Sequence, residues 1–142
     1  MGQFLEKEDA ARVKRALVER YGLHPAAAQY DLVNSIIYAG RILPVAEFSL
    51  FRWGGELNEA LYRIGCMFHD HLPVLVAWER DDTVEAMTFG QLKACFRDRY
   101  LRGFHEMVVF DRRADWFICT HDEGAVGYHL PSSCREDEPD GR

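Results

Sequence analysis

Two short clusters in the sequence combine side chains that could carry chemistry. The first is Cys119-Thr120-His121-Asp122-Glu123, where a thiol stands beside a base and an acid, the combination used in nucleophilic catalysis. On a strand, Cys119 and His121 share a face, but their backbones are ~6.5 Å apart, which is long for a direct thiol–imidazole hydrogen bond. Cys119 also lies in an apolar stretch, where a thiol usually acts as a small hydrophobe. The cluster is a candidate catalytic site, with core and turn roles as the alternative.

The second cluster is His69-Asp70-His71, with Cys66 upstream, and it holds the side-chain types that bind metal ions. On a helix, the two imidazoles point about 200° apart and cannot share an ion, whereas on an extended segment they fall on one face. The apolar stripe that includes Phe68 favours a helix that ends near this point. We therefore expect a helix-end or exposed-loop role here and no bound metal, with a metalloprotein as the alternative.

The sequence contains none of the common cofactor or catalytic motifs. A phosphate loop, a GxSxG elbow, an HExxH pair and a dinucleotide GxGxxG are all missing. The four cysteines are far apart and form no CxxC pair, so the spacing of a zinc finger is missing too. We predict no cofactor.

The charge balance favours a cationic partner. Lys and Arg number 17 and Asp and Glu number 23, so the formal net charge is −6. Such a chain has no general attraction for nucleic acid or for anionic membranes. The second predicted helix, which would read DNA in a helix–turn–helix, has no Lys or Arg before Arg41. We predict a protein partner, with no binding to nucleic acid or membrane.

Acidic residues gather in the predicted turns, and tryptophans stand near them. If these turns fall at the same end of the sheet, their carboxylates converge, and Trp53, Trp78 or Trp116 could supply an aromatic anchor. The alternative is that the turns are simply polar and the tryptophans belong to the core. The predicted partner-binding set is Trp78, Glu79, Asp81, Asp82, Glu85, Asp111, Asp115, Asp122 and Glu123.

Helical periodicity appears in four segments. Ala10, Val13, Leu17 and Tyr21 lie on one face of a first helix, which Gly22 can end. Further helices are predicted from Pro25 to Gly40, around the stripe of Leu57, Leu61, Ile64 and Phe68, and around that of Phe89, Leu92, Phe96 and Tyr100. For the last of these, Thr88 and Gln91 form a capping-box pattern.

Strand patterns occupy much of the remaining sequence. They cover Leu43–Phe51, Val74–Trp78, Glu106–Phe110, Trp116–His121 and Ala125–Leu130. The continuous apolar run Val74–Trp78 is typical of a central strand, and the segment Val74–Phe110 could form one parallel crossover. Asp81–Thr83, Arg112–Asp115 and Asp122–Gly124 are predicted turns.

These elements predict an α+β fold in which N-terminal helices pack on one face of a small mixed, mostly antiparallel sheet. Residues 1–130 are predicted to form a single globular domain, and residues 131–142 a polar, disordered tail. The start of the chain has no apolar run typical of a signal peptide, and no apolar stretch approaches the ~18 residues of a membrane span. With four free thiols, this predicts a cytoplasmic location.

In its build, which is short, acidic and rich in aromatic residues with no catalytic motif, the chain resembles bacterial immunity proteins that neutralise a toxin enzyme. The resemblance implies a small acidic interaction protein that inhibits a cationic partner. Two alternatives stay open. One is a small enzyme or metalloprotein that uses Cys119, His121 and Asp122, or His69, Asp70 and His71. The other is a subunit of a homo-oligomer.

Overall fold

The computed structural model describes residues 2–24, 32–36, 49–52, 69–78, 83–101, 106–120 and 125–129. Within this part the chain forms helices and an antiparallel sheet, which confirms the predicted α+β class. The predicted helix around Leu57–Phe68 and the C-terminal segment 131–142 lie outside the described residues. No helix of the described part is long and apolar enough to cross a membrane.

Helix α1 spans Lys7–Arg20 and buries three of the four residues of the predicted apolar stripe, while the fourth, Tyr21, follows the helix and is half-buried. Ala10, Val13 and Leu17 are enclosed in the main core cluster, and Leu17 is fully buried. Tyr21 is the C-cap residue, and Gly22 follows with a φ of +66°, the left-handed conformation that favours glycine at this position. Residues 32–36 are also helical, and their three buried side chains join the same core.

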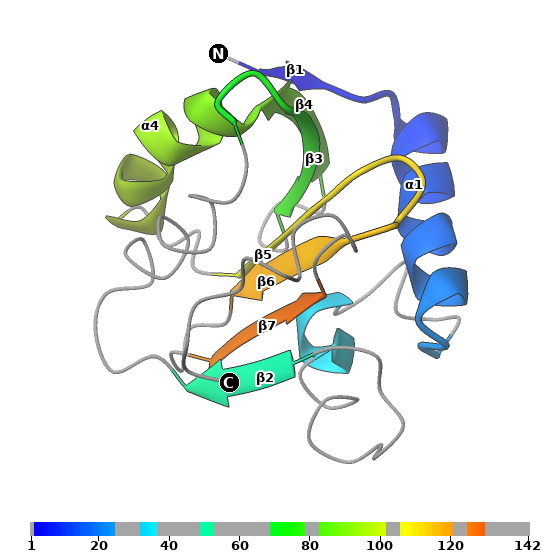
Figure 1. Cartoon of the computed structure of the whole chain (residues 1–142). Helices are drawn as coiled ribbons and strands as arrows, with labels where there is room; N and C mark the ends of the chain where they lie inside the picture. Colours follow the sequence, from blue (N-terminus) through cyan, green and yellow to red (C-terminus); the bar gives the residue numbers. More distant parts are fainter. Residues whose placement is uncertain are drawn as a thin grey trace.

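Seven strands form one sheet in the order β1-β4-β3-β5-β6-β7-β2 (Figure 1), and every strand pair is antiparallel. The strands are β1 (Gln3–Phe4), β2 (Ser49–Arg52), β3 (Pro73–Trp78), β4 (Thr83–Thr88), β5 (Met107–Phe110), β6 (Phe117–Thr120) and β7 (Ala125–His129). Each predicted strand has a counterpart among the described strands, with bounds that differ by a residue or more. Strand β3 begins one residue earlier than predicted and β2 ends one residue later, whereas residues 43–48, 121 and 130 lie outside the described part. Strand β3 lies between β4 and β5, near the sheet centre as predicted.

The predicted parallel crossover from Val74 to Phe110 is wrong. Strands β3 and β5 are neighbours that run antiparallel, with Leu75 opposite Phe110. The chain instead forms a β3–β4 hairpin and then crosses through α4 (Phe89–Leu101), so the crossover joins β4 to β5. Sequence reasoning missed β4 because Glu85 interrupts its apolar pattern, although this residue is 1% exposed.

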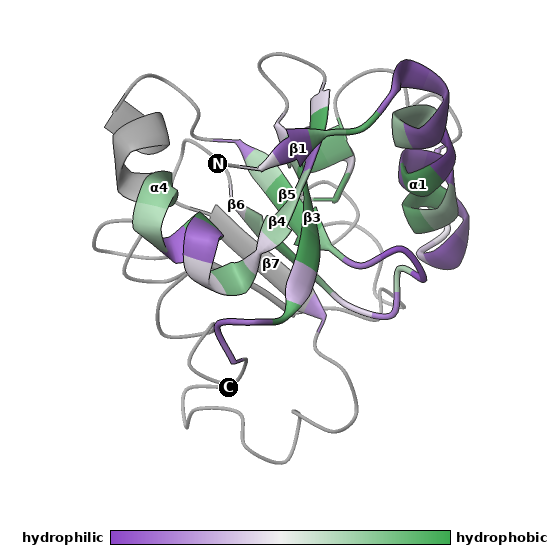
Figure 2. Ribbon diagram, turned by 90° about the horizontal axis from the view of Figure 1, so that it is seen from above, coloured by the Kyte–Doolittle hydropathy of each residue, from purple (hydrophilic) through white to green (hydrophobic). Residues whose placement is uncertain are grey.

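The sheet is covered on both faces, whereas the sequence predicted helices on one face only. Leu75 and Ala77 face the cluster that includes α1, and their neighbours Val74, Val76 and Trp78 are buried on the other face. Figures 1 and 2 show α1 and α4 on opposite sides of the sheet. The sheet residues of the α1-facing core are Leu75, Ala77, Val84, Val108, Phe110, Phe117 and Cys119.

Helix α4 begins with the predicted capping box. The backbone N–H of Gln91 donates to Thr88 Oγ1 at 3.2 Å, and the backbone N–H of Thr88 donates to Gln91 Oε1 at 2.9 Å. Phe89, Leu92 and Phe96 of the predicted stripe are buried. The cap therefore starts the helix directly at the end of β4.

Candidate functional site

The strand register divides the predicted partner-binding residues between two ends of the sheet. Trp78 lies opposite Thr83 in β4 and Met107 in β5, and Met107 lies opposite Thr120 in β6. We call this the loop end, because residues 79–82 and 121–124 leave the sheet there. The segment Asp111–Asp115, which joins β5 to β6, lies at the opposite end, which we call the turn end.

The connections of two hairpins at the loop end are acidic in sequence. The segments 79–82 and 121–124 contain five carboxylates and one arginine, and the hairpins that carry them share this end. Only β5 separates the two hairpins, so the centres of their strand ends are about 14 Å apart, or three strand spacings. The five carboxylates belong to Glu79, Asp81, Asp82, Asp122 and Glu123, which lie outside the described residues.

Trp78 and Glu85, two further members of the predicted set, lie inside the molecule. Each is 1% exposed. Trp78 Nε1 donates a hydrogen bond to Glu85 Oε1 at 3.1 Å, and the backbone N–H of Gly2 donates to Glu85 Oε2 at 3.1 Å. These two side chains therefore hold strands together and do not belong to the surface. Trp116 is also buried, which favours the core interpretation for both described tryptophans.

Asp111 and Asp115 lie at the turn end, away from the other acidic segments. The backbone N–H of Asp115 donates to Asp111 Oδ1 at 2.9 Å, so the Asp111 carboxylate closes the turn. Burial raises the pKa of Asp111, and the hydrogen bond from the Asp115 backbone opposes this rise. The convergence of all predicted acidic residues at one end is therefore not found.

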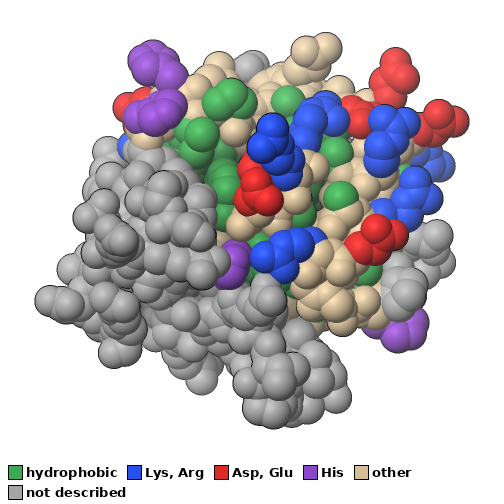
Figure 3. All heavy atoms as spheres, turned by 45° about the vertical axis from the view of Figure 1, so that its right-hand side comes forward, with side chains coloured by type: hydrophobic (Ala, Val, Ile, Leu, Met, Phe, Trp, Pro, Cys, Tyr) green, Lys and Arg blue, Asp and Glu red, His purple; other side chains and the backbone are tan. Residues whose placement is uncertain are grey.

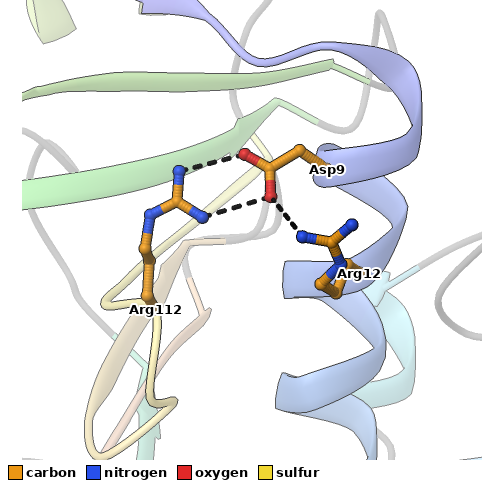
Figure 4. Close-up of polar contacts among 3 residues, drawn as sticks. All are labelled: Asp9, Arg12 and Arg112. Carbon is orange, nitrogen blue, oxygen red and sulfur yellow. Dashed lines mark hydrogen bonds and ion pairs between the residues drawn. The ribbon is translucent and has the colours of Figure 1, made fainter.

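The turn is tied to α1 by two side chains. Arg112 forms a bidentate pair with Asp9, at 3.2 Å from Nη1 to Oδ1 and 3.0 Å from Nη2 to Oδ2 (Figure 4). Arg12 also contacts Asp9, at 3.6 Å. The hydrogen bond from Arg112 lowers the pKa of Asp9 and is the largest cause of that shift. The Tyr21 hydroxyl donates a hydrogen bond to the Ala114 carbonyl oxygen at 2.9 Å.

Ala114 adopts an uncommon backbone conformation within this turn. Its φ is +55°, and it is fully buried. An alanine with this φ is strained relative to glycine, and such strain persists only where the surroundings enforce it. Here the hydrogen bonds of Tyr21 and Asp111 and the packing of the methyl group supply that constraint.

An open groove of about 390 Å³ lies beside the turn. Its apolar lining comes from β3 and β4, and the turn supplies charged side chains of both signs. The lining residues are Pro73, Val74, Leu75, Ala86, Met87, Asp111, Arg112, Arg113 and Asp115. No sequence pattern indicates this groove, because it depends on the pairing of β3 with β4, a strand whose buried Glu85 hides it in the sequence.

His69, Asp70 and His71 form an exposed turn before β3. Asp70 Oδ1 lies 2.6 Å from Lys93 Nζ of α4, and the hydrogen bond from Lys93 is the main reason why the pKa of Asp70 is lowered. The Asp70 carbonyl also accepts from the Gly90 backbone N–H at 2.9 Å. Among the residues that the structure describes, no group of three His, Cys, Asp or Glu side chains could hold a metal ion.

Cys119 lies in the α1-facing core and is fully buried. Its neighbours in this cluster include Val108 and Phe117, which agrees with the role of a small hydrophobe. A nucleophilic thiol must reach a substrate, so this burial disfavours catalysis by Cys119. His121 and Asp122, the other members of that cluster, lie outside the described residues.

Comparison with known proteins identified no relative from which a function could be transferred. No family model matches the chain, and neither the curated proteins nor the solved structures yield a match. The charge, burial and topology of the chain itself are therefore the basis for a functional proposal.

Proposed function

We propose that this chain is an acidic interaction protein that binds a cationic protein and inhibits it. Immunity proteins, which the chain resembles in build, act in this way on toxin enzymes. The observation that carries the proposal is the strand register. It brings the ends of the β3–β4 and β6–β7 hairpins, which bear the acidic segments 79–82 and 121–124, to the same end of the sheet. The partner surface proposed is this loop end, without Trp78 and Glu85.

Electrostatics gives this arrangement a physical role. The two segments carry five carboxylates against the single Arg80, so they contribute much of the net charge of −6. A concentration of one sign of charge at one end of a molecule speeds the approach of an oppositely charged partner. The buried Cys119 thiol supports this proposal over the enzyme alternative, because it leaves that alternative without an accessible nucleophile among the described cysteines.

The test compares two variants that change the net charge equally. In D81N/D82N/D122N, three loop-end carboxylates are neutralised. In the control E6Q/E8Q/E19Q, three exposed carboxylates on and beside α1 are neutralised. Each immobilised protein is exposed to a lysate of the native organism, and captured proteins are identified by mass spectrometry.

We expect the original chain and the control to capture the same basic protein, and the loop-end variant to lose it. Stoichiometric addition of the original chain should then abolish the activity of the captured protein. Equal capture by the two variants would contradict a loop-end surface. Capture of a basic protein whose activity stays unchanged would contradict the inhibitor role.

A further inference from the structure

The turn end differs from the loop end in charge. Helix α1 with its N-cap residue Glu6, and the turn, which together are residues 6–20 and 111–115, carry seven basic and six acidic side chains, although the whole chain has a net charge of −6. Figure 3 shows side chains of both signs mixed on this side of the molecule, next to a patch of hydrophobic side chains. Two copies of an acidic chain repel each other overall, so their association is favoured where the local charges balance.

The turn presents one cation and one anion on a fixed backbone. Arg112 is engaged by Asp9. The side chains of Arg113 and Asp115 are exposed, and Arg113 also acts electrostatically on the nearby Asp111 carboxylate. Ala114 separates Arg113 from Asp115, and its carbonyl is held by Tyr21. A turn that is already fixed loses little conformational entropy when it meets a partner.

We propose that a second copy of this chain docks on the groove at the turn end, with Arg113 of each copy against Asp115 of the other. A two-fold axis brings identical patches together, so a patch with adjacent charges of opposite sign is complementary to itself. The exposed apolar rim at Pro73 and the half-buried Ala86 of the groove lose water in the same contact. This dimer goes beyond the proposed function, because it does not use the loop end.

Sedimentation equilibrium tests the dimer with a charge swap. An interface made of one groove and two reciprocal ion pairs is expected to be weak, with a dissociation constant on the order of 100 µM. In Arg113→Asp or Asp115→Arg alone, like charges face each other, so we expect association to weaken about tenfold or more. The double variant Arg113→Asp/Asp115→Arg restores opposite charges and should restore the dimer. Both positions are exposed, so the variants should keep their fold, which circular dichroism would verify.

A substitution of Phe4 tests whether the two copies associate through the groove at the turn end or through another exposed apolar surface. Phe4 is the large exposed hydrophobic side chain of the described part, at 54% exposure, and it lies on the edge strand β1. Phe4→Ala should leave the dimer unchanged. A chain that stays monomeric well above 100 µM would overturn the proposal. So would single variants that associate as the original does, a double variant that does not recover, or loss of the dimer in Phe4→Ala.

Discussion

The carboxylate of Glu85 connects the N-terminal strand, β3 and β4 from inside the molecule. It accepts hydrogen bonds from Trp78 Nε1 and from the backbone of Gly2, both at 3.1 Å. The approach at Gly2 is close, since a Cβ placed there would lie 2.8 Å from the Ala86 carbonyl oxygen. An acidic side chain that looks like part of a charged loop in the sequence thus has a structural role.

Replacing Glu85 tests this role. Glu85→Ala removes the acceptor for the buried indole N–H, and we expect the free energy of unfolding to fall by about 2 kcal/mol. Glu85→Gln keeps an oxygen that can accept from Trp78, so its loss should be smaller. Urea unfolding followed by tryptophan fluorescence measures both values. An Ala variant as stable as the original would show that these hydrogen bonds contribute nothing.

The Asp9–Arg112 pair gives a stability contribution with a defined pH dependence. Arg112 lowers the pKa of Asp9 below its ordinary value of 3.8 in the folded state. The contribution is therefore fully present above the pKa of the unfolded chain, and it is lost as the pH falls through the lower folded value. Because the pair is exposed, the effect is small.

We expect the stability difference between the original chain and Arg112→Gln to stay constant from about pH 7 to pH 5 and to shrink below about pH 4. Urea titrations at each pH would measure it. A difference that grows in acid would mean that Arg112 acts through a group other than the Asp9 carboxylate.

At the scale of elements, α4 depends on a cap at the exact point where β4 ends. Thr88 both pairs with Pro73 in the sheet and caps the helix through its hydroxyl. Thr88→Ala should lower the free energy of unfolding by about 1 kcal/mol, whereas Thr88→Ser keeps the hydroxyl and should lose only a fraction of this. Thermal unfolding of the two variants would separate capping from strand propensity. An equal loss of unfolding free energy in Thr88→Ala and Thr88→Ser would contradict a stabilising role for the Thr88 hydroxyl as a cap.

The elements that follow simple periodicity could be predicted from the sequence. The stripe of α1, the capping box of α4 and the buried run of β3 each express a local pattern, and the structure confirms them. Strand β4 could not be found in this way, because the buried Glu85 looks like a loop residue. With β4 missed, the hairpin, the true crossover and the groove at the turn end were beyond sequence reasoning.

At the scale of the whole molecule, the strand register brings the acidic connections 79–82 and 121–124 to one end of the sheet. The sequence predicted acidic turns but could not assign them to an end, because strand register depends on contacts between distant segments. The register separates Asp111 and Asp115, beside Arg112 and Arg113, from the loop end. The proposed function and the proposed dimer therefore use opposite ends, and each can fail without the other.

The association rate with the captured partner, measured against ionic strength, tests the central proposal most directly. Steering by the loop end predicts that the association rate constant of the original chain falls at least about tenfold between low and high salt. The D81N/D82N/D122N variant should start slower and depend much less on salt, whereas E6Q/E8Q/E19Q should follow the original. The same salt dependence in all three proteins would contradict the account.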